Sequence, residues 1–129
     1  MKAAIIGSRS LSVPDLYKYL PEGVTEIISG GAKGVDSSAR EYALSCGIPI
    51  TEFLPNYKRY GTSAPLRRNI TIIQRADIVI AFWDGHSRGT KFVIDNCKKA
   101  GKSLTVYSPV SSCLPQEVIS YRPVPLSEV

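Results

Sequence analysis

The chain has 129 residues, of which 43% are hydrophobic and 21% charged, with a formal net charge of +5. This composition is typical of one globular domain, and no apolar run approaches the roughly 18 residues of a membrane span. The basic balance, with a pI of about 9.2, favours an anionic partner such as a nucleotide or a nucleic acid, and nothing points to a membrane partner. The first apolar stretch is too short for a signal peptide, so we expect a cytoplasmic protein.

From the N-terminus onward, apolar runs alternate with amphipathic helical patterns. The predicted strands span residues 3–6, 25–28, 48–53, 77–82 and 103–107. The predicted helices span residues 14–20, 35–46, 65–75 and 90–100. A loop over residues 54–64 precedes the third helix, and a loop of this length in a small domain is usually functional or disordered.

The longer predicted helices each have an apolar face that should cover a sheet. These faces comprise Val35, Ala39, Tyr42, Ala43 and Cys46, then Leu66, Ile70 and Ile73, then Val93, Cys97 and Ala100. The three cysteines, of which Cys113 is the last, are widely spaced and accompany a single histidine. This pattern fits neither a disulfide framework nor a metal centre, so we expect Cys46 and Cys97 to be reduced core residues, with no metal site and no cofactor.

The alternation predicts an α/β fold, a single-domain Rossmann-like three-layer sandwich with a mostly parallel sheet of five strands or slightly more. We assign residues 1–107 to this domain. Residues 108–129 form a C-terminal extension rich in proline and serine, which we expect to pack loosely or to make an oligomer contact, with a short helix over 114–120. Ligands of such folds bind beyond the carboxyl ends of the strands, near a change in strand order.

Three glycines lie between the second strand and the second helix, in the run Ser29-Gly30-Gly31-Ala32-Lys33-Gly34-Val35-Asp36. Glycines let backbone amides approach a ligand closely, and a helix N-terminus attracts an anion such as phosphate. The spacing is neither the Walker A pattern nor Gly-x-Gly-x-x-Gly, which argues against an ordinary NTPase or dehydrogenase. A tight turn whose glycines serve only packing is the alternative.

Two further turns follow predicted strands, Gly7-Ser8-Arg9 and residues 83–90, and we expect all three turns to meet at one edge of the sheet. Backbone amides of Gly30, Gly31 and Gly34 would hold one phosphate, and those of residues 87–90 another. The candidate ligand-binding residues are Gly7, Ser8, Arg9, Ser29, Gly30, Gly31, Ala32, Lys33, Gly34, Asp36, Arg68, Asn69, Trp83, Asp84, Gly85, Ser87, Arg88, Gly89 and Thr90.

The side chains of this set have different expected roles. Arg9, Arg68 and Arg88 can each give bidentate contacts to phosphate, the alternative being a surface salt bridge. Asn69 can fix a loop or bind a ribose hydroxyl, and Trp83 can stack on a base. Asp36, in the first turn of its helix, is more often a dipole-stabilising acid than a catalyst.

These motifs, in this order, resemble the SLOG superfamily, and within it the bacterial and phage group known as a domain of unknown function, DUF2493, related to YspA and YpsA. The resemblance covers residues 2–107 and implies a Rossmann-like domain that binds a nucleotide or a nucleotide-derived ligand. It implies a sensor of such ligands, or a protein that processes them. The LOG phosphoribohydrolases and the single-strand-binding DprA proteins are more distant members.

The leading hypothesis is therefore nucleotide binding as a sensor, and the alternative is a LOG-like hydrolase of nucleoside monophosphates. LOG enzymes carry a glutamate three residues after the threonine of their Gly-Thr turn, a place that Val93 occupies here. Asp95 would point away from that place, since it lies about 200° further around the helix. Asp84 remains the one catalytic candidate, so whether the protein is an enzyme is left open.

Single-stranded nucleic-acid binding ranks third. The run from Gly31 to Asp36 is close to the Gly-x-Arg-Gly-Ile-Asp pattern of DprA, and the residues Tyr57, Lys58, Arg59 and Tyr60 offer a small basic and aromatic surface. The sequence contains no heptad pattern from which a homo-oligomer could be predicted, and self-association is left open.

Overall fold

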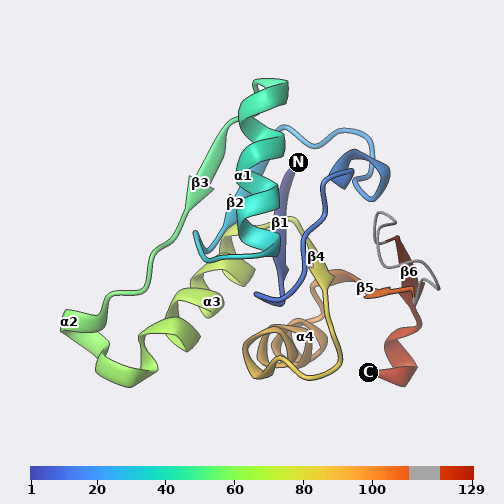
Figure 1. Cartoon of the computed structure of the whole chain (residues 1–129). Helices are drawn as coiled ribbons and strands as arrows, with labels where there is room; N and C mark the ends of the chain where they lie inside the picture. Colours follow the sequence, from blue (N-terminus) through green and yellow to red (C-terminus); the bar gives the residue numbers. More distant parts are fainter. Residues whose placement is uncertain (111–119) are drawn as a thin grey trace.

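The computed structural model describes residues 1–110 and 120–129, and within these residues it is an α/β protein with one six-stranded sheet (Figure 1). The strands are β1 (Lys2–Gly7), β2 (Glu26–Ser29), β3 (Ile50–Glu52), β4 (Ile78–Phe82), β5 (Ser103–Pro109) and β6 (Tyr121–Val124). Their order in the sheet is β3-β2-β1-β4-β5-β6. The first five strands are parallel to their neighbours, and β6 pairs antiparallel with β5.

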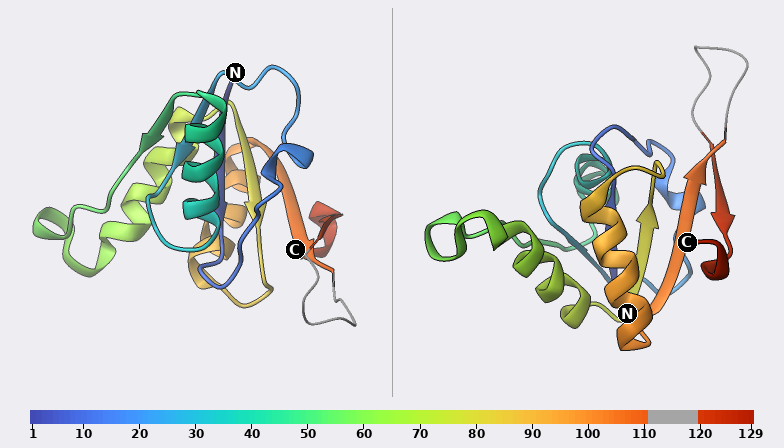
Figure 2. Two further views of the ribbon diagram at one scale, coloured as in Figure 1. Left: turned by 45° about the horizontal axis from the view of Figure 1, so that its top comes forward. Right: turned by 90° about the horizontal axis from the view of Figure 1, so that it is seen from below.

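Three long helices cover the two faces of the sheet: α1 (Val35–Cys46), α3 (Ala64–Arg75) and α4 (Arg88–Ala100). The shorter elements are α2 (Tyr57–Tyr60), η1 (Leu16–Lys18), η2 (Gly61–Ser63) and η3 (Leu126–Glu128). Helix α1 lies on one face, and α3 and α4 lie on the other (Figure 2). This is the three-layer, Rossmann-like sandwich that the sequence predicts. None of the helices in the described part of the chain is both long and apolar enough to cross a membrane.

The central strand β1 shows why the sheet needs cover on both sides. Ala3 and Ile5 belong to the core beneath α1, whereas Ala4 and Ile6 belong to the core beneath α3 and α4. Side chains alternate between the two faces of a strand, so a continuous apolar run requires two apolar layers.

Two predicted elements differ in the structure. The helix expected over residues 14–20 is reduced to η1, a three-residue 3₁₀ turn that buries Leu16, because so short a segment gains too few hydrogen bonds to offset the cost of starting a helix. The loop expected over residues 54–64 contains α2 and η2, and the Asn56 side chain caps α2 by accepting a hydrogen bond from the Arg59 amide at 3.2 Å.

The apolar face predicted for α3 is wrong at two of its three positions. Leu66 and Ile70 are exposed, while Asn69, Ile72 and Ile73 are buried. The helix is therefore rotated so that Arg68 and Asn69 face the sheet edge. Cys97 is buried as expected, but Cys46, in the last turn of α1, is exposed. Ala100, in the last turn of α4, is exposed too.

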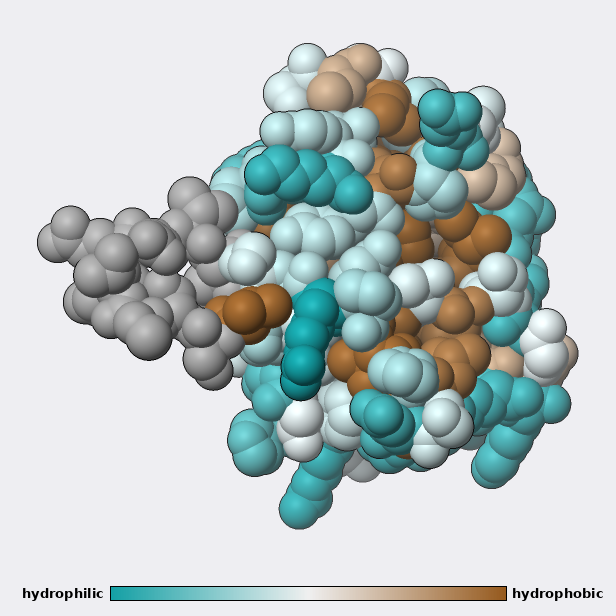
Figure 3. Space-filling view, turned by 90° about the vertical axis from the view of Figure 1, so that its right-hand side faces the viewer, coloured by the Kyte–Doolittle hydropathy of each residue, from teal (hydrophilic) through white to brown (hydrophobic). Residues whose placement is uncertain are grey.

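Four of the C-terminal residues that the structure describes form β6 of the sheet, and η3 follows them. Tyr121 is buried, its hydroxyl donates to the Ser12 carbonyl at 2.7 Å, and its amide donates to the Tyr19 hydroxyl at 3.0 Å. Loose packing is therefore wrong for this strand. On this side of the molecule, hydrophilic and hydrophobic residues are intermixed at the surface (Figure 3). The helix expected over 114–120 and Cys113 lie outside the described residues, except Ser120, which is not helical.

Candidate functional site

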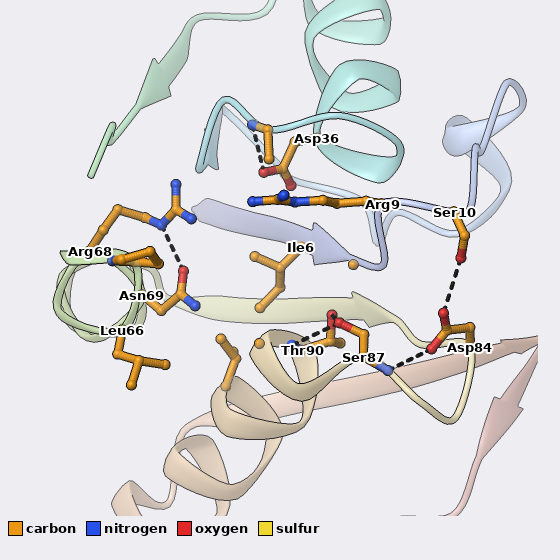
Figure 4. Close-up of a pocket in the computed structure, with 15 residues that line it drawn as sticks. Ile6, Arg9, Ser10, Asp36, Leu66, Arg68, Asn69, Asp84, Ser87 and Thr90 are labelled. Carbon is orange, nitrogen blue, oxygen red and sulfur yellow. Dashed lines mark hydrogen bonds between the residues drawn. The ribbon is translucent and has the colours of Figure 1, made fainter. Parts of the chain in front are cut away.

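The strand order changes direction between β1 and β4. The chain adds β2 and β3 on one side of β1, and then returns to add β4 and β5 on the other. Because β1 and β4 are parallel neighbours, their carboxyl ends lie together, and this is where open α/β sheets bind ligands. A cavity of about 420 Å³ lies there (Figure 4). A cavity of this size falls in the usual range for small-molecule sites.

Ten of the predicted residues line this cavity, which we call the edge cavity: Gly7, Arg9, Ala32, Asp36, Arg68, Asn69, Asp84, Ser87, Gly89 and Thr90. The other predicted residues do not line it: Ser8, Ser29, Gly30, Gly31, Lys33, Gly34, Trp83, Gly85 and Arg88. Sequence reasoning missed Ile6, Ser10, Pro65, Leu66 and Val93 as lining residues. Ser10 directly follows a predicted turn and Leu66 lies two residues before Arg68, so proximity in sequence was the available signal.

The first glycine loop, between β2 and α1, is occupied by a side chain of the protein itself. Asp36 folds back from the first turn of α1, and its Oδ2 accepts a hydrogen bond from the Ala32 amide at 3.1 Å. A carboxylate of the protein thus accepts a hydrogen bond inside the loop whose Gly30, Gly31 and Gly34 amides were predicted to hold phosphate. Only Ala32 and Asp36 of this loop reach the edge cavity.

All three glycines of this loop have close neighbours, which are side-chain ends at Gly30 and Gly31 and backbone at Gly34. A Cβ on Gly30 would lie 2.6 Å from Arg68 Nη1, and one on Gly31 would lie 2.7 Å from Leu54 Cδ2. A Cβ on Gly34 would lie 2.5 Å from the Arg9 carbonyl oxygen, and Gly34 also has a φ of +75°. The geometry therefore favours the packing role over a phosphate cradle at these positions.

Arg68 ties α3 to this loop. Its Nη1 donates to the Gly30 carbonyl at 2.6 Å and to the Phe53 carbonyl at 3.3 Å, and its Nε donates to Asn69 Oδ1 at 2.8 Å. Burial lowers the pKa of the guanidinium, while the charge of Asp36 opposes that change. Within residues 1–110 and 120–129, no hydrogen bond is found from Nη2, and Arg68 lines both the edge cavity and a neighbouring one.

Arg9 approaches the same space from the opposite wall. Its side chain extends across the cavity toward Arg68, and its positive charge contributes to lowering the pKa of Arg68 (Figure 4). Among the described residues, Arg9 has neither a hydrogen bond nor an ion pair from its guanidinium. Two guanidinium groups that line one cavity can both pair with an anionic oxygen there, and the Asp36 carboxyl lies beside them.

The Asp36 carboxyl is the most deeply buried ionisable group of the cavity wall, with 6% of the residue exposed. Burial raises its pKa, whereas the amides of Ala32 and Gly30 and the charge of Arg68 lower it. Its Oδ1 is buried and has no hydrogen-bond partner in the described part of the chain.

The second loop, between β4 and α4, is braced by Asp84. Its Oδ1 accepts hydrogen bonds from the amides of His86 and Ser87, both at 2.8 Å, and its Oδ2 accepts one from Ser10 Oγ at 3.0 Å. Desolvation alone would raise the pKa of the carboxyl, but these hydrogen bonds outweigh it and lower the pKa to about 2. Asp84 is therefore ionised and fully engaged, which disfavours it as a general acid.

The N-terminus of α4 opens onto the cavity. Ser87 caps the helix by accepting a hydrogen bond from the Thr90 amide at 3.4 Å, and its hydroxyl donates to Thr90 Oγ1 at 3.1 Å. The amides of Arg88 and Gly89 belong to the first turn and have no helical acceptor. A Cβ on Gly89 would meet no atom within 4 Å, so open space surrounds this glycine.

Three residues that were predicted to contact a ligand do not line the edge cavity: two of them hold the loop after β4 in place, and the third is exposed. Trp83 donates from Nε1 to the Ser87 carbonyl at 3.0 Å and packs against the core, so it holds the loop. Ser8 is buried, and its Oγ accepts a hydrogen bond from the Asp84 amide at 3.1 Å. The Arg88 side chain is exposed and outside the cavity lining.

The position of the LOG glutamate does face the edge cavity, but Val93 presents only an apolar side chain there. Asp95 points elsewhere, as predicted, and its carboxylate pairs with Lys91 Nζ at 3.1 Å on the exposed face of α4. The cavity wall therefore carries no carboxylate at this position.

The basic and aromatic segment lies apart from the edge cavity. Tyr60 lines a second cavity of about 310 Å³ between the loop after β3 and α3. The guanidinium carbons of Arg67 and Arg59 lie 4.5 Å and 5.2 Å from the centre of its ring. These arginines occupy ring faces on which a base would stack, whereas Tyr57 is largely exposed.

Comparisons with known proteins assign the chain to no family. No protein-family model matches the chain, and no curated protein matches it. Within the described ranges, no three histidine, cysteine, aspartate or glutamate side chains gather as ligands for a metal ion.

Proposed function

We propose that the protein binds a nucleotide or a nucleotide-derived ligand through its phosphate in the edge cavity, and that it acts as a sensor of this ligand. The observation that carries the proposal is the pair Arg9 and Arg68, which face each other across a cavity at the change in strand order. The first turn of α4 lines the same cavity and adds amide donors to it.

The charge of the cavity wall supports an anionic guest. The Asp84 carboxylate already accepts hydrogen bonds from two amides and from Ser10 Oγ, and the Asp36 carboxyl accepts one from the Ala32 amide and lies near Arg68. Beside these engaged carboxylates, the cavity is lined by the guanidinium groups of Arg9 and Arg68. Phosphate matches them because it accepts several hydrogen bonds and pairs with guanidinium in a bidentate geometry.

Binding without cleavage has more support than hydrolysis. Cleavage of an N-glycosidic bond needs a carboxylic group that can stabilise positive charge or move a proton at the reacting atoms. The site offers Val93 in place of the LOG glutamate, and Asp84 is committed to its own loop.

The test is thermal unfolding and calorimetric titration with nucleoside mono-, di- and triphosphates, cyclic nucleotides, NAD, ADP-ribose and inorganic phosphate. A bound ligand at about 100 times its Kd should stabilise the fold by about 2.7 kcal/mol. Chromatography of the mixture after incubation then distinguishes a sensor, which leaves the ligand intact, from a hydrolase, which releases a base.

Two exposed arginines provide a matched pair for this test. Arg9→Ala removes a guanidinium that lines the cavity, and we expect it to weaken binding about tenfold or more. Arg88→Ala removes an equal charge outside the lining and should keep the affinity within about threefold. Equal effects of the two substitutions, or no stabilisation by any phosphate compound, would contradict the proposal.

Single-stranded DNA serves as the competing ligand. Binding to a nucleic acid should weaken steeply with salt and should depend on Lys58, Arg59 and Arg67, which lie around α2. Loss of affinity in Arg67→Ala but not in Arg9→Ala would favour this alternative over a nucleotide in the edge cavity.

A further inference from the structure

Asp36 is a buried polar group that the protein itself uses only in part. Its Oδ2 is occupied by the Ala32 amide, and its Oδ1 is shielded from solvent without a partner in the described residues. Asp36 lines the edge cavity, and its carboxyl lies beside the Arg9 side chain (Figure 4). A buried acceptor that lacks a partner is costly, so a hydrogen-bond donor on a ligand is the group that this position is suited to receive.

A donor faces the same space. Asn69 is buried and accepts the Arg68 Nε proton at Oδ1, which directs its amide NH₂ group away from Arg68 and toward the cavity (Figure 4). Arg68 also lies close to Asp36, because Arg68 Nη1 and Asp36 Oδ2 are 2.6 Å and 3.1 Å from the same point, the Cβ position of Gly30. Asp36, Arg68 and Asn69 thus form one continuous polar wall.

The chemistry of this wall selects among ligand groups. An ionised carboxylate only accepts, and an amide NH₂ group only donates. A hydroxyl satisfies both at once, whereas a phosphate oxygen has no proton to give to Asp36 and an amine has no free acceptor for Asn69.

We propose that the Asp36 carboxyl and the Asn69 amide bind a hydroxyl of the ligand's sugar, while its phosphate lies between Arg9, Arg68 and the first turn of α4. The ligand class is then a ribose phosphate, of which a ribonucleoside 5′-monophosphate is the simplest nucleotide. This inference rests on the proposed function. In such a molecule the ribose directly follows the phosphate, so a group beside the phosphate site meets the sugar before the base.

The charges around Asp36 are compatible with this role. Burial raises the pKa of the carboxyl, and Glu52 adds to that effect from β3. Arg68 from α3 and the amides of Ala32 and Gly30 act in the opposite direction. A ligand hydroxyl that donates to Oδ1 stabilises the ionised form, because hydrogen bonds to a carboxylate favour its charged state.

The experiment titrates the wild-type protein with the four ribonucleoside 5′-monophosphates and with their 2′-deoxy and 3′-deoxy analogues. We expect at least one deoxy series to bind about 10-fold to 100-fold more weakly, as for the loss of a hydrogen bond to a charged group. This comparison needs no variant and so does not depend on the folding of one.

Asp36→Asn then assigns the effect to its carboxyl. The substitution keeps one oxygen for the Ala32 amide, replaces the free oxygen by an NH₂ donor and removes the negative charge. The preference for the ribonucleotide over its deoxy analogue should therefore fall to within about threefold. Glu52→Gln is the control, since Glu52 lies near the same loop, pairs with Arg40 and does not line the edge cavity. It should leave the preference unchanged.

The outcomes separate this inference from the proposed function. Equal affinities for ribo- and deoxyribonucleotides, or a preference that survives in Asp36→Asn, overturn the role of Asp36 but leave phosphate binding in place. Absence of binding by every phosphate compound overturns both. A ribonucleotide preference that is lost in Asp36→Asn and kept in Glu52→Gln supports the inference.

Discussion

The two glycine-bearing loops at the edge of the sheet resemble each other in sequence and differ in use. The loop between β2 and α1 is filled by the Asp36 carboxylate, and Gly30, Gly31 and Gly34 each lie against a neighbouring group. The loop between β4 and α4 is held by its own Asp84, whose carboxylate accepts hydrogen bonds from loop amides, and the Cβ position of Gly89 is open space. The first loop is therefore a packed support. In the second, the amides of His86, Ser87 and Thr90 are bonded to Asp84 and Ser87, and those of Arg88 and Gly89 have no acceptor within the described residues.

This difference shows that a glycine at a strand-to-helix turn has two separate uses. A glycine can be needed because there is no room for a side chain, or because a ligand must come close to the backbone. Substitutions that add a single methyl group distinguish these uses, since they affect stability in the first case and ligand binding in the second.

Gly34→Ala should have the largest effect on stability. The methyl group would lie 2.5 Å from the Arg9 carbonyl oxygen at a backbone φ of +75°, so we expect a loss of about 3 kcal/mol in the free energy of unfolding, measured by urea denaturation. Gly47→Ala is the control, because Gly47 has a φ of +66° but no atom within 4 Å of its Cβ position. It should lose only about 1 kcal/mol, and equal losses would show that close packing is not what the first loop requires.

Asp84→Asn tests the brace of the second loop and should cost about 1–2 kcal/mol at neutral pH, allowing for partial solvent exposure. The folded-state pKa, about 2, is below the ordinary value of 3.8, so the carboxylate stabilises the fold above pH 3.8. This contribution is lost as the pH falls through the window between these two values. Urea denaturation across the window should show the wild type and variant converging; a constant difference would contradict the assignment.

Ser87→Ala removes the N-cap of α4, and we expect a loss of about 1 kcal/mol because the Thr90 amide loses its acceptor. Thermal unfolding measures the effect. Ser37→Ala, a substitution of a similar hydroxyl on α1 that donates to the Ala32 carbonyl instead of accepting an amide, should cost less. A larger loss in Ser37→Ala would reverse the order that capping predicts.

Gly89→Ala should change stability least, by under about 1 kcal/mol and in the stabilising direction, because alanine is the better helix former and the Cβ position is empty. Ligand affinity should fall nonetheless, since the methyl group takes space at the cavity wall. Chemical denaturation and nucleotide titration of the same sample measure the two quantities. A clear loss of stability would show that Gly89, like Gly34, serves packing.

Much of the fold follows from local patterns. The apolar run from Ala3 to Ile6 and the β-rich segments after it predict buried parallel strands, because such strands need cover on both faces. The helix patterns between them predict the crossovers. Strand β6 was missed because its four residues contain Pro123, which is unfavourable in most strands. The segment is a strand through its pairing with β5, which the local sequence does not reveal.

The candidate site was predicted in outline and not in detail. The sequence places Arg9, Asp36 and Gly89 after strands that run in parallel, which brings them to one edge. Leu66 and Ile70 were predicted on the wrong side of α3, since the anchoring of Arg68 to the Gly30 and Phe53 carbonyls is a contact between segments distant in sequence. Trp83 was predicted to stack on a base and Arg88 to contact phosphate, but Trp83 holds the loop through the Ser87 carbonyl and Arg88 does not line the cavity.

The sequence by itself determined the layers, the parallel strands and the edge at which their turns meet, because hydrophobic periodicity and glycine positions act over a few residues. Only the tertiary structure decided which backbone amides are already bonded and which remain open. That outcome depends on where Asp36, Arg68 and Asp84 reach after the chain has folded, and hydrogen bonds between separate segments leave no periodic mark in the sequence.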